Sequence, residues 1–259
     1  MFMKKVYNEK SRLYFIKKSN TINIGIVDNA PPMCFRKNAN EVVGFDVDLA
    51  HSIAKRLNVS LNLQLINNKQ RIEYILTNKI DACIAKLNHT KSRDNLIDFS
   101  VSYLQDCKKI LMHKEDIGPV SELAGKNIAY TIDTSTAIEI ENCFAKLNWP
   151  KPNFIAYPSE EQAYNAMKQK QVIGYASDEI IINHFLNNEA ERSKFQYHPQ
   201  VCCYSYFCVG VSENDSEWLN EINNILLDIY NSGEYEKIFY KWFKVHDKKF
   251  LRPFERWAN

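Results

Sequence analysis

Two charged side chains, far apart in the sequence, could together bind a small molecule that carries both charges. Arg93 follows a short apolar run, 82–85, and a planar guanidinium can make paired, charge-assisted hydrogen bonds to a carboxylate. Asp178 ends a second apolar run, 172–177, and would supply the anion opposite the arginine. Two structural roles stay open: Arg93 as a solvated residue at a helix start, and Asp178 as the cap of a helix that begins at Glu179.

A polar loop in the second half of the chain is a further candidate site. Asp133, Thr134, Ser135 and Thr136 lie between a predicted strand and a predicted helix. Serine, threonine and aspartate side chains cap helix N-termini, so capping alone could explain this composition. A helix N-terminus can also bind an anion. The loop is therefore either a cap or part of an anion site.

Strand and helix patterns alternate along the chain. The predicted strands are 22–27, 61–65, 82–85, 109–112, 127–130, 174–176 and 206–211. The predicted helices are 46–57, 71–77, 136–146, 159–168, 179–187, 217–232 and 235–243. This alternation predicts an α/β fold with a parallel or mixed sheet. A length of 259 residues fits two lobes.

Composition excludes several classes of protein. Hydrophobic residues make up 45% and charged residues 25% of the chain, which is typical of a globular protein. A net charge of +2 is too balanced to favour nucleic acid as the main partner. Apolar runs are far too short for a membrane span. The first 18 residues lack an apolar core of signal-peptide length, so either an export signal was removed or the chain is not exported by that route.

Cysteine and histidine patterns give no metal site. The seven cysteines leave at least one thiol unpaired in a monomer. Cys107, Cys202 and Cys203 could approach one another if both segments flank a hinge, which leaves a disulfide open. The six histidines are scattered without ligand spacing. We expect no metal and no cofactor.

Several motifs in a fixed order carry a family resemblance. A Pro31-Pro32 turn precedes Gly44 and an amphipathic helix with Asp46 and Asp48 in its first turn. The segments 79–100, 172–178 and 233–243 follow. Together these motifs closely resemble the bacterial extracellular solute-binding proteins of the polar amino-acid type, family 3, from about residue 21 to residue 243.

This resemblance implies a periplasmic-binding-protein fold of type II, in which two mixed α/β lobes close around a ligand. The expected divisions are an N-terminal extension (1–19), lobe one (20–102 and 206–246), lobe two (107–201), hinge segments (103–106 and 202–205) and a C-terminal tail (247–259). Two chain crossings of this kind permit closure, and a cleft between lobes is a preferred ligand site.

The resemblance also implies binding roles. Arg93 would grip the ligand α-carboxylate and Asp178 the α-ammonium group, each from its own lobe. Asn88 stands where the family usually has serine or threonine, and Thr90 matches a threonine that can cap the next helix. Lys86 replaces a glycine whose carbonyl meets the ligand ammonium, so its side chain either leaves the cleft or meets an acidic ligand.

The remaining candidates lie in three loops. Ser135, with Thr134 and Thr136 as alternates, would take the α-carboxylate from the other side. Met33 replaces the usual aromatic residue over the ligand's carbon chain, a role that Phe35 could supply. Asp28 is either a rim residue that meets a ligand amine or a loop cap. Arg71 is either a surface residue or, with Lys86, a partner for a side-chain carboxylate.

The implied function is capture of a free polar amino acid in the periplasm and its delivery, as a monomer, to the membrane permease of an ABC transporter. Acidic amino acids such as glutamate are favoured; glutamine and cystine stay open. The resemblance leaves two other functions, a dehydratase-type enzyme on the same scaffold and an amino-acid sensor domain. A catalytic acid aimed into the cleft would be needed for the enzyme, and nothing singles out Asp28 or Glu179 for it.

Overall fold

The structure, a computed structural model, describes residues 10–243, and it confirms the α/β class. The α-helices are α1 (Arg12–Ser19), α2 (Phe45–Leu57), α3 (Gln70–Leu76), α4 (Lys91–Asp94), α5 (Thr136–Lys146), α6 (Glu160–Lys168), α7 (Glu179–Phe185), α8 (Glu189–Lys194), α9 (Ser216–Asn231) and α10 (Glu234–Phe243). Two 3-10 helices are η1 (Lys114–Asp116) and η2 (Val120–Leu123). The strands are β1 (Thr21–Ile26), β2 (Asn29–Ala30), β3 (Cys34–Asn38), β4 (Glu41–Val43), β5 (Ser60–Leu65), β6 (Ala82–Cys83), β7 (Asp98–His113), β8 (Asn127–Thr131), β9 (Asn153–Tyr157), β10 (Gly174–Asp178), β11 (Phe195–Tyr197) and β12 (Cys203–Val211).

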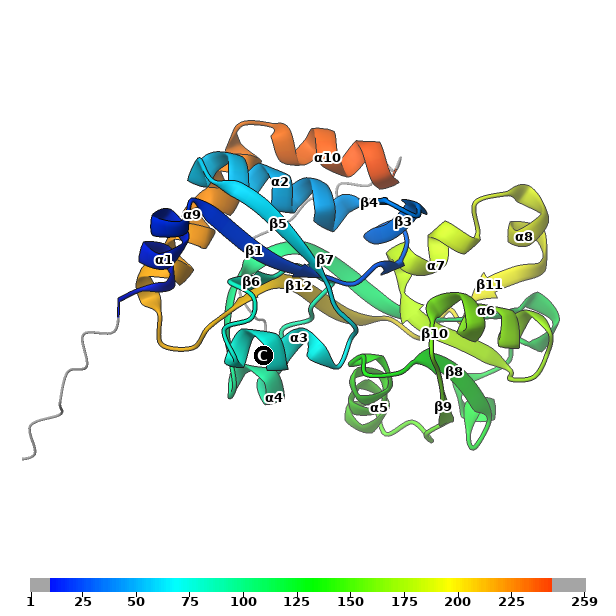
Figure 1. Cartoon of the computed structure of the whole chain (residues 1–259). Coiled ribbons are helices and arrows are strands. Elements are labelled where there is room, and N and C mark those ends of the chain that lie inside the picture. Colours follow the sequence, from blue (N-terminus) through cyan, green and yellow to red (C-terminus); the bar gives the residue numbers. More distant parts are fainter. Residues whose placement is uncertain (1–9, 244–259) are drawn as a thin grey trace, which may run out of the picture.

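One mixed sheet runs through the molecule in the order β5-β1-β6-β12-β7-β10-β8-β9, with β11 beside β7. Strand β1 pairs in parallel with β5 and β6, whereas β12 runs antiparallel to β6 and β7. The first lobe contains β1, β5 and β6 with α1 to α4, α9 and α10, and the second contains β8 to β11 with α5 to α8 (Figure 1). The three-stranded sheet β2-β3-β4 belongs to the first lobe.

The two lobes are joined by the long antiparallel strands β7 and β12 (Figure 1). The expected hinge segment 103–106 lies inside β7, which is 16 residues long, and Cys203 begins β12. A disulfide links Cys107 of β7 to Cys202, while Cys203 keeps a free thiol. The disulfide that the sequence left open is therefore present, and it ties together the two strands that cross between the lobes.

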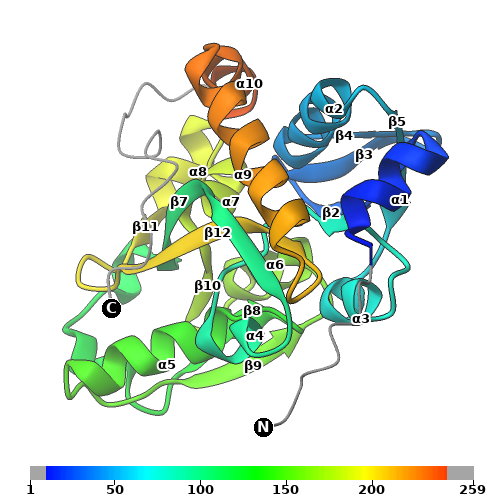
Figure 2. The same ribbon diagram turned by 90° about the vertical axis from the view of Figure 1, so that its left-hand side faces the viewer.

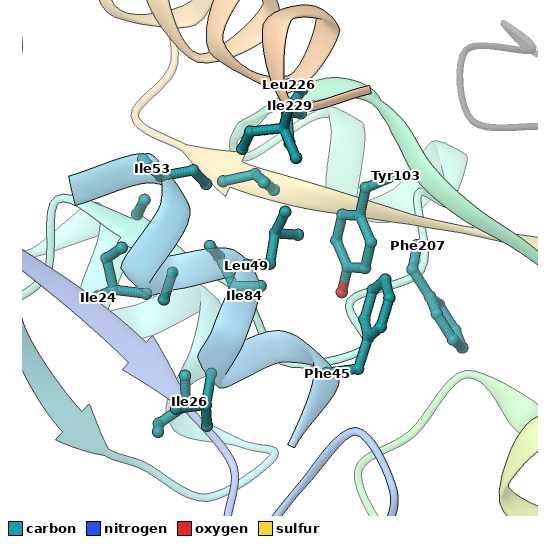
Figure 3. Packing of buried hydrophobic residues seen from close by; sticks show 14 of the residues in the cluster. Ile24, Ile26, Phe45, Leu49, Ile53, Ile84, Tyr103, Phe207, Leu226 and Ile229 are labelled. Carbon is teal, nitrogen blue, oxygen red and sulfur yellow. The ribbon is translucent and has the colours of Figure 1, made fainter. Parts of the chain in front are cut away.

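The core of the first lobe forms where α2, α9 and α10 pack together against the sheet (Figures 1 and 2). Side chains from each element meet there, with Leu49 and Ile53 of α2 facing Leu226 and Ile229 of α9 (Figure 3). Gly44 starts α2 with a φ of 146°, and a Cβ there would lie 2.1 Å from the carbonyl oxygen of Met33. Only glycine allows the loop and the helix to approach so closely.

Helix α1 was not predicted from the sequence. Its residue Ile16 is fully buried in the first lobe's core, and Arg12 pairs with Asp81 at the start of β6. Part of the expected N-terminal extension is thus packed on the first lobe. Within residues 10–243, no helix is both long and apolar enough to cross a membrane.

Candidate ligand-binding site

On the first lobe, the site is built by the turn between β6 and α4. The Thr90 hydroxyl accepts a hydrogen bond from the Arg93 amide (3.4 Å) and so caps α4. This turn directs the Arg93 guanidinium back to the chain, where Nη1 donates to the carbonyl oxygen of Asn88 (3.0 Å). Among residues 10–243, the guanidinium has no further hydrogen-bond acceptor or ion-pair partner. Several of its donors are thus available to a ligand.

Asn88 lies at the boundary between the lobes. Its side-chain amide donates to the Ser135 hydroxyl (2.9 Å) and to both carboxylate oxygens of Glu139 (3.3 Å each). The residue is only 2% exposed. Its Oδ1 has no hydrogen-bond partner among the described residues, and a buried polar atom without a partner is costly. The first lobe therefore offers a free acceptor beside the free donors of Arg93.

On the second lobe, Asp178 ends β10 opposite Lys108 of β7 and is 1% exposed. One carboxylate oxygen contacts the Lys108 ammonium and accepts from the Ser205 hydroxyl (3.3 Å). The other lies 3.4 Å from Nζ of Lys86, which belongs to the first lobe. The Asp178 side chain does not cap α7. Instead Asp106 accepts from the Ile180 amide (3.2 Å), so the side-chain cap suggested for Asp178 is wrong.

Glu160 is a second buried carboxylate on the same lobe. It is the first residue of α6, whose preceding Ser159 caps the helix by accepting from the Gln162 amide. Glu160 Oε1 lies 2.6 Å from Nζ of Lys86. Hydroxyls of Tyr175 and Ser177 donate to Oε2, at 2.7 and 3.0 Å.

The loop before α5 has a different role from the simple cap that its composition suggests. Ser135 is the N-cap residue, but its side chain makes no capping hydrogen bond and accepts from Asn88 instead. The Thr134 hydroxyl donates to the carbonyl oxygen of Thr131 (2.6 Å). Thr136 is buried as the first residue of α5. Of the three candidates, the structure brings Ser135 to the other site residues.

Two further candidates, Arg71 and Met33, are buried. Arg71 is 2% exposed, and its guanidinium donates to the carbonyl oxygens of Asn68, Ala85 and, across the lobe boundary, Asp133. The surface reading of Arg71 is therefore wrong. The side chain of Met33 is fully buried in the first lobe's core.

The last two candidates, Asp28 and Phe35, lie at the rim of the site. Asp28 pairs with the exposed Arg36 (2.6 Å), and its carboxylate makes no loop-capping hydrogen bond within residues 10–243. The Phe35 ring lies 6.4 Å from the His184 ring of α7 and 5.9 Å from that of Trp242. Phe35 thus reaches the second lobe, as an aromatic residue covering the cleft would.

Sequence reasoning missed four residues of the site, namely Asp106, Lys108, Glu139 and Glu160. One signal was readable: Asp106 and Lys108 are two residues apart between the apolar pairs 103–104 and 110–111, and alternate strand residues share a face. Charged residues on a buried strand face need partners. Glu139 and Glu160 lie on helices, where glutamate is ordinary, and gave no signal.

Lysines decide the charge of the two deepest carboxylates. Burial by itself raises the pKa of Asp178, but Lys108 and Lys86 outweigh it and hold the pKa below its ordinary value. Burial likewise acts on Glu160, and Lys86 again lowers its pKa overall. Asp106 differs, because burial and the neighbouring Asp178 raise its pKa well above the usual range. Asp178 and Glu160 are thus ionised, each beside a lysine.

Asp46 at the start of α2 should make stability depend on pH. Its carboxylate accepts from the Lys86 amide and the Tyr103 hydroxyl, both at 2.9 Å. Burial raises its pKa from 3.8 to about 7. The folded state then binds more protons than the unfolded state between these values, so stability falls as pH rises through this window. Between pH 5 and 7 the loss should be about 2–3 kcal/mol.

Urea unfolding at several pH values, compared with Asp46→Asn, isolates this contribution. The wild type should lose stability more steeply than the variant up to pH 7. Parallel stability curves would show that Asp46 is ionised throughout.

Comparison with known proteins supports an amino-acid site. The ABC transporter arginine-binding protein 1 of Escherichia coli is 25% identical over 226 residues, which is 86% of this chain and 90% of that protein. The histidine-binding periplasmic protein of Escherichia coli is 26% identical over 231 residues, 86% of this chain and 87% of the relative. The glutamine-binding protein GlnH of Bacillus subtilis is 24% identical over 242 residues, 92% and 86% of the two chains.

Solved structures agree on the two-lobed fold. A mutant of the arginine-binding protein from T. maritima aligns with a TM-score of 0.77 and 26% identity, covering 90% of this chain and 100% of that one. A Streptococcus pneumoniae substrate-binding protein with bound histidine aligns with a TM-score of 0.81 at 21% identity, covering 91% and 97%. At 21% identity, the second match is evidence for the fold alone.

The family model of the bacterial extracellular solute-binding proteins, family 3, matches residues 22–245. This range includes every residue of the site described above. The chain therefore belongs to family 3 of the bacterial extracellular solute-binding proteins.

Proposed function

We propose that this protein is the substrate-binding component of an ABC transporter for a free polar amino acid, which it holds between its two lobes. One observation carries the proposal: at the lobe boundary, the remaining guanidinium donors of Arg93 lie beside Oδ1 of Asn88, and within residues 10–243 neither those donors nor that oxygen has a partner. A carboxylate suits the donors, and an ammonium group suits the acceptor. An α-amino acid carries both groups two bonds apart.

The second lobe supplies the anions for the ligand ammonium. Glu139 lies 3.3 Å from the Asn88 amide, and Asp178 and Glu160 lie deeper at the same boundary. In this proposal Arg93 holds the α-carboxylate from the first lobe, and Asp178 holds the α-ammonium group from the second. Each lobe then contributes one half of the binding charges, so the ligand is held fully only where both lobes meet.

An acidic amino acid fits the charges of the site best. Among the described residues, Asp178 and Glu160 each have a lysine partner, whereas Arg93 has no carboxylate partner. A ligand with a second carboxylate would give Lys86 a new anion once the ligand ammonium meets Asp178, whereas a basic ligand would bring a further cation beside Lys86 and Lys108. Glutamine and cystine are the next candidates, since they carry polar side chains without positive charge.

The named relatives support the location and the partner. One is called a periplasmic protein and two are named as ABC transporter proteins. We propose that this protein acts outside the cytoplasmic membrane as a monomer, and that closure brings both lobes into position to dock on a membrane permease.

A thermal-shift screen against the twenty amino acids and cystine tests the proposal. A ligand at 100 times its dissociation constant adds about 2.7 kcal/mol to stability, which is easily measured. We expect glutamate or aspartate to give the largest shift, and calorimetry should then give one site per chain. Stabilisation by prephenate-type acids, with none by any amino acid, would contradict the proposal and favour a dehydratase.

A further inference from the structure

Lys86 has an unusual backbone conformation at the lobe boundary. Its φ is 38°, in the left-handed region that lysine seldom adopts. A hydrogen bond holds this conformation, because the backbone amide of Lys86 donates to the Asp46 carboxylate (2.9 Å) at the start of α2. The residue is only 6% exposed. The first lobe thus holds Lys86 at some conformational cost and aims its side chain in one direction.

That direction leads into the second lobe. Nζ of Lys86 lies 2.6 Å from Glu160 Oε1 and 3.4 Å from Asp178 Oδ2. The other oxygens of these carboxylates are already taken, by Tyr175 and Ser177 on Glu160 and by Lys108 and Ser205 on Asp178. The ammonium group of Lys86 therefore fills the remaining coordination of a preformed pair of carboxylates.

The chemistry of this contact is that of amino-acid recognition. A primary ammonium group sits between two buried carboxylates, and the ligand proposed above carries the same group. Burial alone lowers the pKa of Lys86, but Glu160 and Asp178 outweigh it and raise the pKa overall. The side chain is therefore charged, and it spans the two lobes as a bound ligand would.

We propose that Lys86 is a built-in substitute for the ligand ammonium group and sets the selectivity of the site. Without ligand, it occupies Glu160 and Asp178 and latches the second lobe onto the first. An incoming amino acid must displace it, which lowers affinity because a tethered competitor has a high effective concentration.

The selectivity follows from the state of Lys86 after the ligand has displaced it from Glu160 and Asp178. This part of the inference rests on the proposed function. Once displaced, the Lys86 ammonium is buried without its carboxylates, which is costly unless another anion replaces them. An acidic amino acid can supply that anion with its side-chain carboxylate. A neutral amino acid such as glutamine cannot, so Lys86 penalises it.

The latch itself is tested without any ligand. Small-angle X-ray scattering on ligand-free protein should show a larger radius of gyration for Lys86→Met than for the wild type. Lys170→Met, which removes an exposed lysine paired with Glu115 within the second lobe, should leave the radius unchanged. Glu160→Gln should open the protein similarly, and the double variant should open it no further, because both changes break one contact.

Calorimetry then tests the selectivity. The ratio of the dissociation constants for glutamine and glutamate should fall at least tenfold in Lys86→Met, mainly because glutamine binds more tightly. An unchanged ratio, or weaker binding of both ligands in parallel, would overturn the selectivity role and make Lys86 an ordinary ligand contact.

The two readouts separate this inference from the proposed function. If no amino acid binds the wild type or the variants, the proposed function fails and the selectivity falls with it, while the scattering still decides the latch. An unchanged radius in Lys86→Met would refute the latch even if glutamate binds. If the single variants fold poorly, the scattering measurement can use the double variant Lys86→Met with Glu160→Gln. This variant removes one charge of each sign and so leaves neither member of the pair unpaired.

Discussion

Replacing Arg93 with alanine should remove most of the affinity for the amino-acid ligand while the protein stays folded. The guanidinium makes one hydrogen bond within the described chain, to the Asn88 carbonyl oxygen, so folding loses little. In the complex it would face the ligand carboxylate in a closed site. Truncating one member of such a buried charge pair costs about 2–5 kcal/mol, or roughly 30-fold to several thousand-fold in the dissociation constant.

Isothermal titration calorimetry of Arg93→Ala against the best ligand of the screen measures this loss. Arg36→Ala is a matched control, because Arg36 is exposed at the rim, where it pairs with Asp28 and donates to the Ala39 carbonyl oxygen. Arg93→Lys should restore part of the affinity, since it keeps the charge but loses the paired geometry. Wild-type affinity in Arg93→Ala would exclude Arg93 as the carboxylate ligand.

Replacing Lys108 with methionine should strongly destabilise the protein. Lys108 is 1% exposed, contacts Asp178 and lies 3.9 Å from Glu139. Methionine keeps the length and the apolar stem of the side chain but leaves Asp178 without its nearest cation. Removing one partner of a buried ion pair costs about 3–5 kcal/mol, because the remaining charge stays buried. Urea denaturation at neutral pH should show this loss.

The matched control is Lys170→Met, which breaks the exposed pair with Glu115 and should not change the unfolding midpoint measurably. Adding Asp178→Asn to Lys108→Met should restore part of the stability, since it removes the orphaned charge. If Lys108→Met loses no more stability than the control, Lys108 is not needed to stabilise the buried charge of Asp178.

Local patterns in the sequence determined most of the secondary structure. The helix expected at 136–146 is α5 with the same bounds, and five strands within the two lobes lie close to their predicted positions. Helix periodicity and strand alternation are set by neighbouring residues, so they are readable without tertiary contacts. Helices α1, α4 and α8 were missed, because each buries at most one residue and so shows no apolar period.

The sequence also limited the candidate site to the right segments, but it could not decide what each residue does there. It placed Arg93 and Asn88 on one lobe and Asp178 and Ser135 on the other, through the order of the motifs. It did not show that Asp178 has its own lysine on β7, because the register of β10 on β7 depends on pairing between distant strands. Glu160 enters the site through the packing of α6 on β8 and β10, which is also a long-range contact.

Lys86 separates the two kinds of information most clearly. The resemblance places Lys86 where the family typically has glycine, and it left the side chain either leaving the cleft or meeting an acidic ligand. Only the fold decided that its ammonium meets Glu160 and Asp178 of the opposite lobe. Periodicity and caps are local and are written in the sequence; the partners of a buried charge are chosen by long-range packing, which only the tertiary structure fixes.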